Sequence, residues 1–142
     1  MIDSSRQQLE TRVLLKYLPA KVFRFMDIGT SKPYLVCAAK TNNGKIYTLR
    51  IELDQFPESV PKVFVMEMLK TKSGENMDEC SASMHTLTSE NGWTRICHYG
   101  NNWRDNVSLW RVIYKCLMWL NCYERHLQTG EDIDSFLDHQ PM

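Results

Sequence analysis

Residues 42–53, NNGKIYTLRIEL, decide the fold class of this chain. The stretch opens on Asn42-Asn43-Gly44, residue types that tolerate the positive φ angles of a tight hairpin turn. Polar and apolar side chains then alternate, and the apolar ones share one face: Tyr47, Leu49, Ile51 and Leu53. The stretch therefore predicts a turn followed by a strand, at residues 45–53, with one buried face.

Three further segments predict strands that pair with it. Residues 22–28 are rich in aromatic side chains and partly alternate, and residues 34–40 form a short apolar run. Prolines at 57 and 61 interrupt pairing because proline has no N–H to donate, and residues 63–69 then resume a strand. Together the four segments predict an antiparallel meander with one buried face.

Two helices are predicted at either side of the meander. Ser5 and Gln8 have the spacing of a capping box, apolar residues follow at helical spacing, and Pro19 ends a helix over residues 5–18 that would cover the sheet. Ser108 is the expected N-cap of a second helix of about twenty residues, whose apolar positions recur at i, i+3 and i+4. That helix reaches as far as Thr129-Gly130.

The remaining segments predict loops and a tail. Residues 70–83 are polar, and residues 85–106 contain two glycines and several asparagines, so we expect a long irregular segment there. The tail, residues 129–142, is acidic, and its apolar residues are compatible with a short helix. The order of elements predicts an α+β fold in a single domain over residues 1–142, with a core of about 5–128.

Composition narrows the function classes. The chain has 142 residues and a formal net charge of zero, which argues against nucleic-acid binding. Its N-terminus lacks the features of a signal peptide, and no apolar run is long enough to cross a bilayer, so we expect a cytoplasmic protein with no membrane partner. All five cysteines are then expected to be reduced thiols.

The order of motifs resembles that of ubiquitin-conjugating enzymes. Residues 47–51 lead into Phe56-Pro57 and Pro61-Lys62-Val63, like the strand, aromatic-proline corner and Pro-Lys-Val strand start of that family. Residues His85, Gly92 and Ile96-Cys97 resemble the family's His-Pro-Asn, glycine and Ile-Cys series. Residues 103–109 resemble its tryptophan and capped second helix. The resemblance covers roughly residues 5–127 and implies the ubiquitin-conjugating fold, with Cys97 as the thioester-forming cysteine.

A narrower resemblance is to bacterial members of this superfamily found in CBASS anti-phage defence operons. It is carried by Gly92, residues 96–99, Trp103 and the helix that ends at residues 119–130. It implies that the chain carries the C-terminus of a cGAS-like nucleotidyltransferase, or of another protein with an exposed C-terminus, to an acceptor protein. A separate activating enzyme would be a further partner.

The chain departs from the eukaryotic pattern around its histidine. Thr86 and Leu87 stand where the family has proline and asparagine, the stretch from His85 to Cys97 is longer, and His98-Tyr99 follows the cysteine. Because this asparagine is missing, the sequence does not identify the group that would donate a hydrogen bond to the oxyanion. Thr86, Thr88, Asn91 or backbone N–H groups are the alternatives, and the product can be an amide or a thioester.

The chemistry expected of Cys97 is that of a nucleophilic thiol. A thiolate attacks an activated carboxyl, and a nearby cation would increase the thiolate fraction. Arg95 and His98 are close enough in sequence to provide this cation. His98 is equally consistent with a solvent-facing residue that takes no part in the chemistry. We expect His85 to support its loop, with a role as base as the alternative. We expect Trp103 to pack the cysteine loop onto the long helix as a core anchor.

The other cysteines have simpler expected roles. Cys37, Cys116 and Cys122 lie in predicted regular elements and are expected to pack in the interior, while Cys80 lies in a polar loop and is expected to be exposed. The spacing of Cys80, His85 and Cys97-His98 matches no usual zinc site, so no metal is expected.

No Gly-rich phosphate loop occurs, so no cofactor is expected. Two alternatives to a transferase stay open: a non-catalytic binding module on the same fold, and an unrelated α+β interaction protein.

Overall fold

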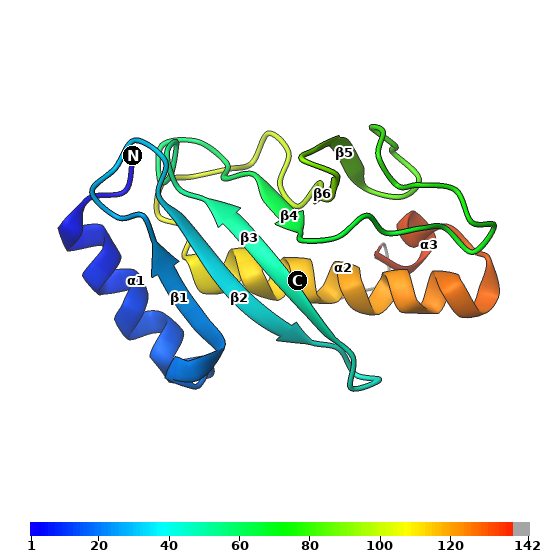
Figure 1. The fold of residues 1–142 in the computed structure, drawn as a ribbon, viewed down its shortest axis with the longest axis horizontal. Coiled ribbons are helices and arrows are strands. Elements are labelled where there is room, and N and C mark those ends of the chain that lie inside the picture. The colour runs from blue at the N-terminus through cyan, green and yellow to red at the C-terminus, as the bar shows by residue number, and fades with distance from the viewer. Residues whose placement is uncertain (138–142) are drawn as a thin grey trace.

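A computed structural model describes residues 1–137 and shows a six-stranded antiparallel sheet with helices on one side of it and at its ends (Figure 1). The strand order is β1-β2-β3-β4-β6-β5. The long helix α2 crosses one face of the sheet, α1 lies near the β1 end, and α3 lies near the far end of α2. The elements are α1 (Ser4–Tyr17), a 3₁₀ turn (Ala20–Val22), β1 (Phe23–Met26), β2 (Tyr34–Lys40), β3 (Ile46–Glu52), β4 (Val63–Val65), β5 (Thr86–Glu90), β6 (Trp93–Ile96), α2 (Leu109–Thr129) and α3 (Ile133–Leu137).

The predicted α+β class and the β2–β3 hairpin are confirmed. Gly44 has a φ of 87°, and the amide of Thr41 donates to the carbonyl of Lys45 across the turn at 2.8 Å. The register pairs Leu35 with Ile51 and Cys37 with Leu49. The alternating apolar side chains of residues 45–53 all lie in the core, as expected: Tyr47, Leu49, Ile51 and Leu53.

The predicted number of strands was wrong, because part of the segment expected to be irregular is a hairpin. Strands β5 and β6 pair with each other, and β6 also pairs with β4, so residues 86–96 extend the sheet. Their turn is Asn91-Gly92, with φ angles of 57° and 77°. Asn-Gly is itself a strong hairpin signal, so the local sequence already favours this turn.

Two strands are shorter than predicted. Strand β1 covers only Phe23–Met26 of residues 22–28, because the chain enters it through the 3₁₀ turn. Strand β4 covers only Val63–Val65 of residues 63–69. After it, the amide of Leu69 donates to the Thr94 hydroxyl at 2.9 Å, so a side chain takes the place of a ladder partner.

Helix α1 differs from its prediction in both its cap and its face. Asp3 is the N-cap and accepts from the amide of Arg6, so the chain starts its helix before the proposed Ser5 capping box. The expected apolar stripe does not cover the sheet: Leu14 is buried, whereas Leu9 and Tyr17 are exposed. The main helix contact of α1 is with α2.

Helix α2 confirms the predicted amphipathic helix. The Ser108 hydroxyl accepts from the amide of Arg111, and Gly130 ends the helix in the left-handed conformation. Its buried Trp119 donates from Nε1 to the carbonyl of Met84 at 3.0 Å. This bond ties the helix to the segment that leads into β5.

The tail contains the short helix α3, as its apolar residues allowed. Ile133 and Phe136 are buried against the core, and the Arg125 guanidinium lies 4.4 Å from the Phe136 ring centroid. Residues 138–142 of the predicted acidic tail lie outside the described residues.

Candidate functional site

Cys97 directly follows β6 and lines an open groove. Its amide donates to the carbonyl of His85 at 2.9 Å, which continues the pairing of β6 with the start of β5. The groove has a volume of about 560 Å³ and is formed by residues of the 80–87 segment, Cys97 and Asp134. Because Cys97 is only half-buried, its sulfur can meet a reactant from solution.

Exposure separates Cys97 and Cys80 from the other three cysteines. Cys37, Cys116 and Cys122 are buried, as predicted, and burial raises the pKa of each thiol, to about 11 for Cys37. Cys80 is exposed, also as predicted, and it lines the same groove as Cys97. Of the five thiols, the two at this groove are therefore the candidates for nucleophilic chemistry at neutral pH.

His85 lies beside Cys97 and is hydrogen-bonded to a carboxylate. It adopts a left-handed conformation with a φ of 51°, and its Nε2 lies 2.6 Å from Oδ1 of Asp134. Asp134 comes from α3, 49 residues further along the chain. Sequence analysis did not single out Asp134, since an aspartate in an acidic tail carries no local signal that it will meet a histidine.

Thr86 does not fit the predicted role of oxyanion donor. Its side chain is buried, and its hydroxyl donates to the carbonyl of Glu79 at 2.8 Å. Asn91 lies in the hairpin turn, at the opposite end of β6 from Cys97, and Thr88 does not line the groove. Of the donors considered, backbone N–H groups remain.

Arg95 is engaged by a carboxylate rather than held free for the thiolate. Its guanidinium lies 3.8 Å from Glu90, which also accepts from Lys62 at 2.8 Å. The Arg95 Nε is buried and has no hydrogen-bond partner among the described residues. Its positive charge is therefore partly offset by a nearby acid.

His98 follows Cys97 in sequence but is not arranged as a cationic thiolate partner. Its Nε2 lies 2.9 Å from the carbonyl of Pro61, which accepts the ring N–H, and its Nδ1 is shielded from solvent. Burial, together with the charges of Lys115 and Arg95, lowers the pKa of His98 to about 4, although the bond to Pro61 opposes the shift. The ring is therefore neutral at pH 7 and supplies no positive charge to the sulfur.

Acidification should test this arrangement of His98. Between the unfolded pKa of 6.5 and the folded value of about 4, the unfolded state binds more protons, so the free energy of unfolding falls as pH falls. His98→Gln keeps a donor for Pro61 but cannot titrate. We expect its free energy of unfolding to fall less between pH 7 and pH 4 than that of the parent, by on the order of 2 kcal/mol. Urea unfolding at pH 7 and pH 4 measures it, and an unchanged pH dependence would contradict the assignment.

Trp103 anchors the segment after the cysteine to the aromatic-proline corner. Its Nε1 donates to the carbonyl of Pro57 at 2.9 Å, and its ring packs edge-on against Phe56 and Tyr99. The aromatic-proline corner therefore receives the chain that follows Cys97.

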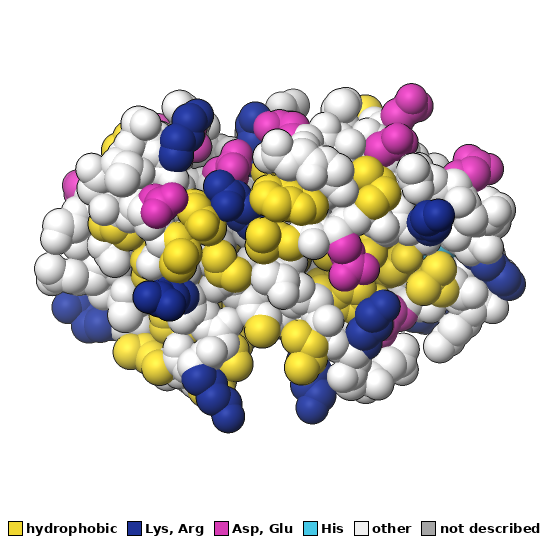
Figure 2. All heavy atoms as spheres, in the orientation of Figure 1, with side chains coloured by type: hydrophobic (Ala, Val, Ile, Leu, Met, Phe, Trp, Pro, Cys, Tyr) yellow, Lys and Arg dark blue, Asp and Glu magenta, His cyan; other side chains and the backbone are white. Residues whose placement is uncertain are grey.

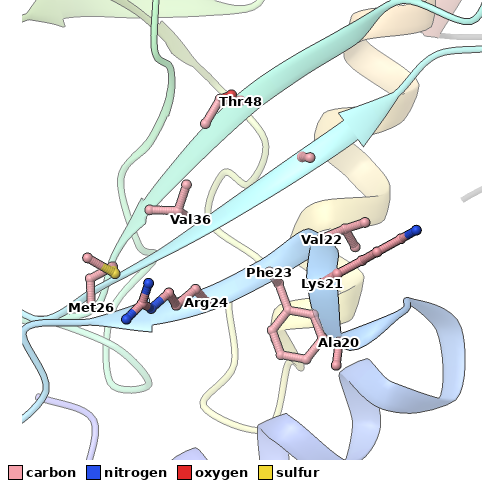
Figure 3. A pocket seen from close by; sticks show the side chains of 9 residues that line it. Ala20, Lys21, Val22, Phe23, Arg24, Met26, Val36 and Thr48 are labelled. Carbon is pink, nitrogen blue, oxygen red and sulfur yellow. The ribbon is translucent and has the colours of Figure 1, made fainter.

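A second hollow lies on the face of the sheet that α2 does not cover, where hydrophobic side chains gather among lysines and arginines (Figure 2). It has a volume of about 630 Å³, and its side chains come from the 3₁₀ turn, β1, β2 and β3 (Figure 3). None of its lining residues is a cysteine, histidine or carboxylate, so it offers no nucleophile of the kind found at Cys97.

Two further properties bear on function. No group of three or more histidine, cysteine, aspartate or glutamate side chains within residues 1–137 is arranged to hold a metal ion. Among the helices of that same range, none combines the length and apolar character needed to cross a bilayer.

The chain matches no family model, and neither a curated protein nor a solved structure is significantly similar to it. A functional assignment therefore depends on the residues at the groove and their geometry.

Proposed function

We propose that the protein is an acyl transferase of the ubiquitin-conjugating type that carries the C-terminal carboxyl of a partner protein as a thioester on Cys97. The observation that carries this proposal is the half-buried Cys97 thiol at the edge of an open groove. A carrier thiol must be accessible to a large donor yet held by a rigid element, and Cys97 meets both needs at the end of a strand.

The groove supports a chain end as the donor. Its volume of about 560 Å³ lies in the range of sites that bind small ligands, and it is open rather than enclosed. A folded donor could not enter such a space, whereas the last few residues of an extended tail could. Cys97 stands at the wall of this groove, where a terminal carboxyl would arrive.

The order of elements further supports the ubiquitin-conjugating fold. A helix precedes an antiparallel sheet, an aromatic-proline corner receives a tryptophan, and a long capped helix follows the cysteine segment. The motif series that resembles CBASS members suggests a cGAS-like nucleotidyltransferase as donor and a second protein as acceptor, in bacterial anti-phage defence. A separate activating enzyme would supply the donor in activated form.

Mass spectrometry under non-reducing conditions tests the proposal. The full chain, co-expressed with its genomic neighbours, should gain the mass of a donor protein at Cys97, and hydroxylamine or excess thiol should release it. A donor bound to Cys80, or stable non-covalent binding with Cys97 free, would contradict the proposal, and the second result would favour a binding module.

A further inference from the structure

We propose that Asp134 of α3 is a positioning residue that orients His85 as the proton acceptor for the Cys97 thiol. This inference rests on the proposed function, because it concerns how the same sulfur becomes reactive. It gives α3 a role in the chemistry of the groove, in addition to its packing.

The pairing of strands places His85 opposite Cys97. Thr86 pairs with Ile96 at the end of the ladder, and directly beyond this pair the amide of Cys97 donates to the carbonyl of His85. Ile96 is buried, whereas His85 and Cys97 line the groove together with Thr86.

The bond to Asp134 determines which ring nitrogen of His85 is available. Nε2 carries the proton that it donates to Oδ1 at 2.6 Å, so Nδ1 of the neutral ring is left as an acceptor. Nδ1 is the ring nitrogen nearer the backbone, and the backbone of His85 is hydrogen-bonded to Cys97. The carboxylate also stabilises the imidazolium that forms when Nδ1 takes up a proton.

Packing holds both partners of this bond in place. On the His85 side, the preceding Met84 is buried and its carbonyl accepts from the Trp119 indole. On the Asp134 side, the flanking Ile133 and Phe136 are buried, and the amide of Asp134 donates to the carbonyl of Ser83 at 2.9 Å. The backbone on both sides of this bond is therefore held in place, and the Asp134 side chain, which is 50% exposed, reaches His85 from it.

The step transfers one proton and exchanges one acyl bond. The proton moves from Sγ of Cys97 to Nδ1 of His85, and the thiolate attacks the carbonyl carbon of an activated donor, such as a thioester or an acyl phosphate. The new S–C bond forms as the old acyl bond breaks. The departing thiolate or phosphate takes the proton from the imidazolium, which returns His85 to its neutral form.

Site-resolved alkylation with iodoacetamide tests this role in the full chain. Cys80 lines the same groove without lying opposite His85, so its rate is an internal reference in every sample. We expect His85→Asn, which tolerates the left-handed backbone, to lower the Cys97-to-Cys80 rate ratio at pH 7 about tenfold. Asp134→Asn should lower it about threefold to fivefold.

Two variants distinguish positioning from packing. Asp132→Asn removes the same charge from an exposed neighbour and should leave the ratio unchanged. Asp134→Glu keeps a carboxylate within reach and should restore at least half of the loss. A ratio unaffected by Asp134→Asn, in a protein whose thermal unfolding matches the parent, would overturn the inference.

A donor-loading assay separates this inference from the proposed function. If Asp134→Asn leaves the alkylation ratio unchanged while Cys97 still gains the donor, the positioning role is wrong and the carrier role stands. If the ratio falls as expected but no donor is ever found on Cys97, the His85–Asp134 pair is supported and the carrier proposal fails.

Discussion

Cys97→Ala is expected to abolish conjugation of the donor protein, with a loss of more than about a thousandfold in rate. No other thiol can replace the Cys97 thiol at this position. Three cysteines are buried in the core, and Cys80 does not lie at the end of the β5–β6 ladder beside His85. Without the sulfur, no thioester can form, and the groove can only bind the donor tail. Denaturing electrophoresis without reductant, followed by mass analysis of the product, measures the effect.

Two variants sharpen this experiment. Cys80→Ala is the matched control, because it removes an exposed thiol from the same groove and should leave donor loading unchanged. Cys97→Ser should load slowly but give an oxygen ester that withstands added thiol. Full conjugation by the Cys97→Ala protein would show that this sulfur is not the carrier.

Glu10→Ala is expected to lower the free energy of unfolding by about 3 kcal/mol, the largest effect on stability foreseen for a single polar side chain. Glu10 is only 2% exposed, and its two oxygens have separate partners. One accepts from the amide of Leu109 at 2.7 Å, and the other accepts from Arg6 at 2.7 Å. Truncation would leave the partly buried Arg6 cation and the first amide of α2 without this acceptor.

The same network holds the segment that joins the cysteine to α2. The Arg6 guanidinium donates to the carbonyls of Asp105 and Val107, so the charge of Glu10 fixes Arg6, and Arg6 fixes the approach to the helix. A carboxylate at the first turn of α2 is also favoured by the helix dipole. Loss of Glu10 should therefore loosen residues after Cys97 as well as lower global stability.

Denaturant unfolding with two companion variants tests the role of Glu10. Glu10→Gln keeps an acceptor for Leu109 and should cost less than Glu10→Ala, because only the charge is lost. Gln8→Ala lies on the same helix at an exposed position and should change stability by less than about 0.5 kcal/mol. Equal effects for Glu10→Ala and Gln8→Ala would show that the buried network contributes little.

The local sequence pattern was sufficient to predict those elements that are specified by residues close together in the chain. The Asn43-Gly44 turn, the alternation of residues 45–53 and the Ser108 cap all depend on contacts a few positions apart, and each is found as predicted. The β5–β6 hairpin was missed although its Asn91-Gly92 turn carries the same local signal. Helix α1 was only partly predicted, since its partner surface belongs to α2 rather than to the sheet.

At the candidate site, too, some features could be predicted from the sequence and others could not. Cys97 could be singled out because its motif order is visible in sequence, and the burial of Cys37 and Cys116 followed from their elements. Proximity in sequence was a poor guide to its partners: His98 turns to Pro61, and Thr86 turns to Glu79. Strand residues next to one another point to opposite faces, so a neighbour in the chain is often remote at the sheet surface.

The sequence by itself determined the hairpin, the long amphipathic helix, the α+β class and the one cysteine to test, because periodicity and turn chemistry are local properties. Only the tertiary structure decided what lies around that sulfur. His85 meets Asp134 because α3 packs its apolar side chains against the core and brings a carboxylate back across 49 residues. Such a contact is set by the burial of Ile133 and Phe136 against distant partners, and no spacing within the tail encodes it.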